Sequence, residues 1–139
     1  MKKLYEAQVT NVGGRTGKSF AIDQSFSIDI APAKELSGIE TKATNPEQLF
    51  AAGYSACFNS ALQSVLRRDR ITYESSEVTA FVALLLDPSD KGYMLGVRIV
   101  ASVKGINLEM AEKYVKQAHG VCSYSKAIRG NIIVDLEVK

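Results

Sequence analysis

Apolar and polar residues alternate in several stretches of the chain, a period of two that is typical of strands with one buried face. Near the start, this pattern predicts three strands, over Leu4–Thr10, Lys18–Ile22 and Phe26–Ile30. Two longer strands are predicted at about Glu74–Leu86 and Tyr93–Val103. The residues between these two long strands include Pro, Asp and Gly, a composition that favours a hairpin connection.

A long helix is predicted in the middle of the chain from several independent signals. Asn45 is a favourable N-cap, and Pro46 follows it at the first helical position. Glu47 adds an acidic residue to the first turn, and Gln48 is placed for a capping-box contact. From Leu49 to Val65 the residues are largely small or apolar, so this helix is expected to be central and to pack on most of its sides.

The rest of the chain completes the order of elements. A second helix is predicted to begin after Asn107, a suitable N-cap, and to stop near Gly120, and a last strand is predicted over Ile132–Val138. The order is therefore three strands, a helix, two strands, a helix and a strand, in which hairpins dominate. This order predicts the α+β class. At 139 residues the chain is expected to form a single domain over residues 1–139.

Charge and hydropathy narrow the set of partners. The 17 basic and 15 acidic residues leave a formal charge of +2, far below the basic footprint of a nucleic-acid-binding protein. No apolar stretch approaches the roughly 18 residues of a membrane span. The two lysines near the start have no apolar run behind them, unlike a secretory signal. The sequence therefore predicts a soluble cytoplasmic protein that binds neither nucleic acid nor membranes.

The two cysteines, Cys57 and Cys122, are the first candidates for chemistry. In a reducing cytoplasm they are expected to be free core thiols, metal ligands or redox-active groups rather than a permanent bridge. They lie far apart in the sequence, which excludes a CxxC motif, and His119 is the one histidine, so a tetrahedral metal site lacks ligands. No metal is expected. His119 stands at the end of the second predicted helix, where a histidine more often complements the helix dipole than assists a thiol.

Cys57 is open to two interpretations. In the middle of an apolar helix it can be an inert side chain, because burial raises the pKa of a thiol and keeps it protonated. It can be a nucleophile if a cation lies beside it, because the thiolate is the form that attacks. The natural candidate is Arg15, in the glycine-rich segment Gly13–Gly17, whose backbone can adopt unusual angles. The alternative for Arg15 is an ordinary solvated side chain in a turn.

Glu47 is the candidate partner of Arg15, because a desolvated guanidinium without an acidic neighbour costs several kcal/mol. In the helix it precedes Cys57 by almost three turns, roughly 15 Å along the axis, so Arg15 would have to span that distance. The alternative for Glu47 is a carboxylate that only complements the helix dipole.

Three segments together carry a resemblance to a known family. They are Gly13–Gly17, Asn45–Phe58 and Val121–Asn131. In this order they resemble the organic hydroperoxide resistance (Ohr) branch of the Ohr/OsmC family, and the resemblance covers essentially the whole chain. The family commonly has Pro where Ser123 stands and a smaller polar residue where Lys126 stands.

The resemblance implies a role for four side chains. Cys57 is implied to be the peroxidatic cysteine and Cys122 the resolving cysteine, while Arg15 activates the thiolate and Glu47 orients Arg15. The resemblance also implies antiparallel sheets around a long central helix in an intertwined homodimer. No metal, haem, flavin or other cofactor is implied.

The activity implied by the resemblance is that of a thiol-dependent peroxidase. The Cys57 thiolate would reduce an organic hydroperoxide, of an alkyl or lipid kind, to its alcohol, and the resulting sulfenic acid would condense with Cys122 into a disulfide. The lipoyl dithiol of a lipoylated protein would then restore both thiols. Two other hypotheses stay open: a noncatalytic thiol redox sensor or apolar-ligand module, and an OsmC-like relative with another hydroperoxide preference.

Overall fold

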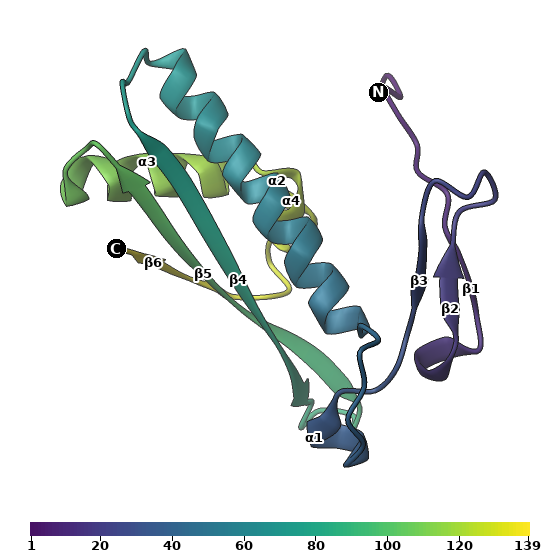
Figure 1. The fold of residues 1–139 in the computed structure, drawn as a ribbon. Coiled ribbons are helices and arrows are strands. Elements are labelled where there is room, and N and C mark those ends of the chain that lie inside the picture. The colour runs from purple at the N-terminus through teal and green to yellow at the C-terminus, as the bar shows by residue number, and fades with distance from the viewer. The chain divides into compact units, whose positions relative to one another are not determined.

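The computed structural model describes residues 1–139, which divide into two compact units, Met1–Leu49 and Phe50–Lys139. The first unit is built on an antiparallel sheet in the order β1 (Thr10–Val12), β2 (Lys18–Phe20) and β3 (Ser27–Asp29) (Figure 1). A short helix, α1 (Lys34–Ser37), follows the sheet. The single domain expected over residues 1–139 stays a prediction.

The strand predicted over Leu4–Thr10 is wrong, because β1 begins only at Thr10 and the residues before it form no regular element. The pairing of β1 with β2 explains the difference. The three residues of β2 pair with Thr10–Val12, from Thr10 opposite Phe20 to Val12 opposite Lys18. The alternating segment before Thr10 therefore has no neighbouring strand in this unit, and its Leu4 side chain is exposed.

The glycine-rich segment forms a tight turn rather than an open loop. A single 3-10 turn, η1 (Gly14–Thr16), connects β1 to β2. It is entered through Gly13 at φ 85°, in the left-handed region that favours glycine. A Cβ on Gly17 would lie 1.8 Å from the backbone oxygen of Val12, so no side chain fits there. Both glycines are therefore needed to close the turn.

The second unit contains the long helix and a second sheet. Its elements are α2 (Pro46–Arg68, beginning in the first unit), β4 (Ser75–Leu86), β5 (Tyr93–Lys104), α3 (Leu108–Val121), α4 (Ser123–Ile128) and β6 (Val134–Val138). Figure 1 shows α2 running alongside the long hairpin of β4 and β5. The predicted long helix, hairpin, second helix and last strand are confirmed, whereas α1 and α4 were not predicted.

The second sheet has the order β4-β5-β6 and is mixed. The expected antiparallel pairing holds for β4 and β5 along their whole length, from Ser75 opposite Lys104 to Leu86 opposite Tyr93. In contrast, β6 pairs parallel to β5. The chain between β5 and β6 carries α3 and α4, and a connection that contains a helix can bring the next strand back in the same direction.

Helices α2 and α3 share one core with the second sheet. Val97, Ile99 and Ala101 point from β5 into this core. The buried helix side chains that meet them are Tyr54, Phe58, Leu62, Val65, Leu66, Ala111, Tyr114, Val115 and Ala118. Phe81 and Leu85 on β4 are exposed, so part of the sheet is left uncovered in the single chain.

The expectation that α2 packs on most of its sides is not met within one chain. The helix buries one face, on which Tyr54, Phe58 and Leu62 recur every four residues, while Ala52 and Ala56 on the other side are exposed. The expectation arose because small apolar residues occur on all sides of this helix in the sequence. None of the helices, α2 included, combines the length and apolar character that crossing a membrane requires.

Candidate active site

Arg15 and Glu47 form a bidentate ion pair in the first unit. Arg15 Nη2 lies 2.6 Å from Glu47 Oε1, and Arg15 Nη1 lies 3.0 Å from Glu47 Oε2. The Glu47 side chain is 12% exposed and that of Arg15 is 44% exposed, so the carboxylate is the more enclosed partner. Hydrogen bonding from Arg15 lowers the pKa of Glu47 from its ordinary value. Glu47 is therefore an ionised anchor that fixes the guanidinium.

The turn that carries Arg15 is fixed by Asn11. The Asn11 side chain accepts a hydrogen bond from the Gly14 backbone N–H at 2.9 Å and donates to the Lys18 carbonyl at 3.3 Å. These contacts tie both ends of the turn to one side chain. A hollow of about 340 Å³ lies beside it, lined by Arg15, Ser19, Ile30, Leu49 and their neighbours.

The start of α2 places Glu47. Asn45 caps the helix as predicted, because its Oδ1 accepts the Gln48 backbone N–H at 2.8 Å. The Gln48 side chain does not complete the capping box. Instead, its Oε1 accepts a hydrogen bond from the Thr44 hydroxyl at 2.6 Å. The cap fixes the first turn, in which Glu47 stands.

Cys57 and Cys122 come together in the second unit, although they are remote in the sequence. Their Sγ atoms are 3.4 Å apart, with the Cys122 thiol donating to the Cys57 sulfur. Both are free thiols, and Cys122 is 1% exposed whereas Cys57 is half-buried. A disulfide requires about 2.05 Å between the sulfurs, so a shift of little more than 1 Å would be needed.

The pKa of Cys57 is lowered by hydrogen bonds. Burial by itself raises the pKa of this thiol, but hydrogen bonds from the Ser123 hydroxyl, the Tyr124 backbone, the Cys122 thiol and the Ser123 backbone together outweigh burial. The Ser123 Oγ lies 3.2 Å from the Cys57 Sγ. A neutral set of donors thus favours the thiolate, a cause that the sequence argument, which required a cation, did not consider.

The pKa of Cys122 is shifted in the opposite direction. Burial raises its pKa above the ordinary value of a cysteine, and donation to Cys57 adds to this effect. The helices around Cys122 explain why it is covered: it lies between the last residue of α3 and the first residue of α4. The two neighbouring sulfurs are therefore unequal, with Cys57 the more readily ionised.

A buried hydroxyl network supports the segment that follows Cys122. Ser125, which is 0% exposed, lies 2.8 Å from the Tyr54 hydroxyl and 3.0 Å from His119 Nδ1. Burial, followed by the charge of Arg129, lowers the pKa of His119. The dipole interpretation of His119 is therefore incomplete, because its ring also holds Ser125. Lys126, in the same short helix, points to solvent.

Three aromatic rings pack beside this network. Tyr54 and Tyr124 are stacked at 5.6 Å between ring centroids, and Phe50 meets both rings edge-on. Gly53 makes room for this arrangement, because a Cβ there would lie 2.4 Å from the Tyr124 hydroxyl oxygen. Gly53 thus allows the Tyr124 ring to approach α2, which brings Ser123 close to Cys57.

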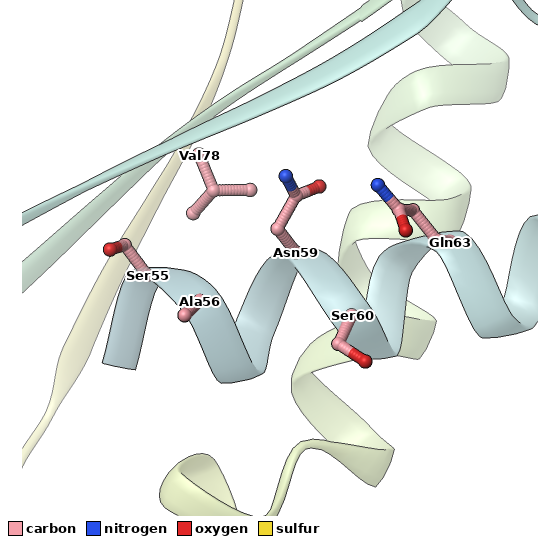
Figure 2. A pocket seen from close by; sticks show the side chains of 6 residues that line it. All are labelled: Ser55, Ala56, Asn59, Ser60, Gln63 and Val78. Carbon is pink, nitrogen blue, oxygen red and sulfur yellow. The ribbon is translucent and has the colours of Figure 1, made fainter. Parts of the chain in front are cut away.

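A separate hollow of about 280 Å³ lies along α2 and contains no cysteine. Its lining is shown in Figure 2: Ser55, Ala56, Asn59, Ser60, Gln63 and Val78. Asn59 and Gln63 bind the Ser76 hydroxyl, at 2.7 Å and 3.2 Å, and so hold α2 against β4. With no titratable side chain in its lining, this hollow is a less suitable candidate than the thiol pair.

The structure thus brings the four predicted residues together as two pairs, Arg15 with Glu47 in the first unit and Cys57 with Cys122 in the second. Sequence reasoning named Ser123 only as a departure from the family pattern, without a role for its hydroxyl, and it missed Ser125 and Tyr54. One signal was available, since both serines lie within three residues after Cys122 in the sequence.

Comparisons with known proteins agree with this fold. The family model described as OsmC-like protein matches residues 39–137. The chain is 52% identical to organic hydroperoxide resistance protein OhrA of Bacillus subtilis, over 97% of this chain and 96% of that protein. A relative from Staphylococcus epidermidis, named organic hydroperoxide resistance protein-like 2, is 46% identical over 97% of this chain and 95% of its own length.

Two solved structures share the whole fold. An organic hydroperoxide resistance protein from Legionella pneumophila has a TM-score of 0.93 and 46% identity, covering 99% of each chain. OhrB of Bacillus subtilis has a TM-score of 0.89 and 42% identity, covering 99% of this chain and 100% of its own. The chain therefore belongs to the OsmC family. Within that family it belongs to the organic hydroperoxide resistance (Ohr) branch, as the three motifs indicated.

Proposed function

We propose that this chain reduces organic hydroperoxides with Cys57 as the attacking thiolate and Cys122 as the resolving thiol. The observation that carries the proposal is the pair of free sulfurs at 3.4 Å whose pKa values are shifted in opposite directions. One sulfur favours the nucleophilic form, and the other stays protonated within reach. The names of the relatives, which are organic hydroperoxide resistance proteins, supply the substrate class.

In the first step, the Cys57 thiolate attacks the outer oxygen of the hydroperoxide. The O–O bond breaks, an S–O bond forms, and the inner oxygen leaves as an alkoxide that takes up a proton to give the alcohol. The sulfur is oxidised to a sulfenic acid while the hydroperoxide is reduced. An apolar alkyl group suits the neighbouring Tyr124, whose ring meets Phe50 edge-on and which directly follows Ser123, the residue in contact with Cys57.

In the second step, Cys122 attacks the sulfenic sulfur of Cys57. An S–S bond forms, the S–O bond breaks, and the hydroxyl leaves as water with the proton that Cys122 gives up. The short distance between the sulfurs supports this step, because little movement is needed. Disulfide formation protects Cys57 from further, irreversible oxidation.

Arg15 and Glu47 are assigned to the same reaction in this proposal. Arg15 stabilises the Cys57 thiolate and the charge that develops on the leaving oxygen, and Glu47 keeps the guanidinium in a fixed orientation. Support comes from the bidentate pair itself, since two parallel hydrogen bonds define the plane of the guanidinium. The lowered pKa of Glu47 keeps this anchor ionised.

A lipoyl dithiol on a lipoylated protein completes the cycle in the proposal. Its two thiols reduce the Cys57–Cys122 disulfide by exchange and are themselves oxidised to a cyclic disulfide, so that electrons and protons balance. No cofactor of the chain itself takes part. We also propose a homodimer, which is supported by the exposed Phe81 and Leu85 on the sheet and by the uncovered side of α2.

Steady-state assays of Cys57→Ser and Cys122→Ser test the two thiol roles. Cumene hydroperoxide and hydrogen peroxide serve as alternative substrates, and dihydrolipoamide and thioredoxin as alternative reductants. Cys57→Ser is expected to abolish hydroperoxide reduction, while Cys122→Ser is expected to give about one turnover followed by overoxidation of Cys57. The wild-type protein should favour cumene hydroperoxide and dihydrolipoamide.

Other outcomes identify the competing hypotheses. Steady turnover by Cys57→Ser would overturn the assignment of the attacking thiol. Oxidation of the wild-type thiols without recycling by either dithiol would indicate a noncatalytic redox sensor. A preference for hydrogen peroxide would favour an OsmC-like relative with another substrate range.

A further inference from the structure

The Ser123 side chain directly contacts the Cys57 sulfur. Its Oγ lies 3.2 Å from the Cys57 Sγ, slightly closer than the Cys122 Sγ at 3.4 Å. Ser123 is exposed, and this contact is the one hydrogen bond that its hydroxyl makes. The side chain therefore has no evident part in holding the core together.

The direction of this hydrogen bond is set by the charge of Cys57. While Cys57 is a thiol, either the sulfur or the hydroxyl can donate. Once Cys57 is a thiolate it can only accept, so the hydroxyl proton of Ser123 must point to the sulfur. Hydrogen bonds to an ionised partner are stronger than neutral ones, so the contact favours the thiolate over the thiol.

Ser123 is held in place by groups on both sides of it. Cys122 before it is buried, and Tyr124 after it stacks on Tyr54 of α2. Hydrogen bonding from the Tyr124 backbone also contributes to the lowered pKa of Cys57. The hydroxyl is thus presented to Cys57 by a segment anchored on the core, which limits the entropy lost when the hydrogen bond forms.

We propose that Ser123 is a catalytic residue of this site, whose hydroxyl donates a hydrogen bond to the Cys57 thiolate and thereby sets how much of Cys57 is ionised near neutral pH. No bond of Ser123 breaks in the reaction, because its hydroxyl keeps its proton. The proposal rests on the function proposed above, since Cys57 must be the attacking sulfur for Ser123 to affect catalysis. Ser123 is thus a neutral hydrogen-bond donor that stabilises the Cys57 thiolate in addition to the cation proposed for this role, Arg15.

The test is the pH dependence of Cys57 alkylation in the reduced full-length protein. Iodoacetamide is the probe, and peptide mass spectrometry assigns the adduct to Cys57 or Cys122. Ser123→Ala removes the donor and is expected to move the titration midpoint of Cys57 to higher pH. At a pH well below that midpoint, alkylation of Cys57 should be slower by roughly three- to tenfold.

Ser123→Thr is the matched variant, because it keeps a hydroxyl at the same position. It is expected to restore a midpoint close to that of the wild type. Ser64→Ala, which removes an exposed hydroxyl elsewhere on α2, is expected to change nothing. A Cys57 midpoint in Ser123→Ala equal to that of the wild type would overturn the proposal.

Hydroperoxide kinetics distinguish an electrostatic effect from a structural one. Below the midpoint, Ser123→Ala should reduce cumene hydroperoxide more slowly than the wild type. Above both midpoints the two rates should meet or cross, because a more basic thiolate is the better nucleophile once it is formed. The same loss of rate at every pH would show a merely structural role and would overturn the proposal.

The alkylation assay contains no hydroperoxide, so its result does not depend on peroxidase activity. If the wild-type protein had no peroxidase activity but Ser123→Ala still shifted the Cys57 midpoint, the proposed function would be wrong and Ser123 would still be the donor to Cys57. An active wild type with an unshifted variant would remove the role of Ser123 alone. The two failures can therefore be told apart.

Discussion

In residues 1–49 two opposite charges are held at a partly open surface, whereas in residues 50–139 two free cysteines are held beside a packed core. Arg15 and Glu47 belong to a unit in which Ile30 is the one buried hydrophobic residue. Cys57 and Cys122 meet next to Tyr54 and Phe58, which are completely enclosed. The first pair is therefore positioned by its own hydrogen bonds, and the second by the packing of α2 against α3 and α4.

This difference has consequences for how each pair fails. An ion pair with one partly exposed partner contributes little to stability, so its loss is expected to be local. Cys57 lies on α2, and Cys122 lies between α3 and α4, so the distance between the sulfurs depends on the packing of these helices and its loss is coupled to unfolding of the core. Substitutions in the first unit should therefore have smaller and more local effects on stability than substitutions in the core of the second unit.

Phe58→Ala is expected to have the largest effect on stability. Phe58 is 0% exposed in the core and follows Cys57 directly, so its truncation leaves a cavity. The free energy of unfolding should fall by about 3 to 5 kcal/mol in urea titrations. Leu108→Ala, at a side chain that is 54% exposed in the same unit, is the control and should change it by about 0.5 kcal/mol or less. Equal effects of the two variants would contradict the central place of this core.

Ser125→Ala is expected to have an intermediate effect. It removes the partner of the Tyr54 hydroxyl and of His119 Nδ1 in a site closed to solvent. Leaving buried polar groups unpaired costs about 1 to 3 kcal/mol, measured as a lower midpoint in urea. Ser123→Ala, two residues earlier and exposed, should leave stability nearly unchanged. Equal stability of the two serine variants would contradict this prediction.

Glu47→Gln is expected to have the smallest effect on stability, confined to the first unit. With the carboxylate gone, the turn that carries Arg15 should open more often, and hydrogen exchange of the amides at 14–16 should accelerate by up to about fivefold. The pKa of Glu47 is lower in the folded protein, so its stabilisation is present above the unfolded value and is lost as the pH falls through the folded one. The difference between variant and wild type should therefore vanish in acid. A difference that persisted there would exclude the ion pair as its cause.

The long elements of the fold could be predicted because they carry strong local signals. The Asn45 and Asn107 caps form as expected, and the alternation over β4 and β5 is confirmed by their continuous pairing. The segment before Thr10 alternates as well, but a strand needs a neighbour, and the alternation does not report whether one exists. The parallel pairing of β6 with β5 could not be predicted for the same reason, because it depends on where α3 and α4 place the chain before β6.

The residues of the candidate site could be proposed from the sequence, but the contacts that shift their pKa values could not. Arg15, Glu47 and Cys57 each had an ordinary interpretation as well, and the roles of these three residues and of Cys122 came from the family resemblance. Ser123 stood out only as a position where the family commonly has Pro, and no role was assigned to its hydroxyl. Only the packing of Tyr124 against Gly53 and Tyr54 brings that hydroxyl to Cys57. Such contacts arise between distant segments, which local patterns do not describe.

The most direct test of the account is the identity of the sulfur that a hydroperoxide oxidises first. The reduced protein is mixed with one equivalent of cumene hydroperoxide in the presence of dimedone, which traps sulfenic acids, and its peptides are mapped by mass spectrometry. We expect a Cys57–Cys122 disulfide in the wild type and a dimedone adduct on Cys57 in Cys122→Ser. A dimedone adduct on Cys122, with Cys57 still a free thiol, would contradict the account.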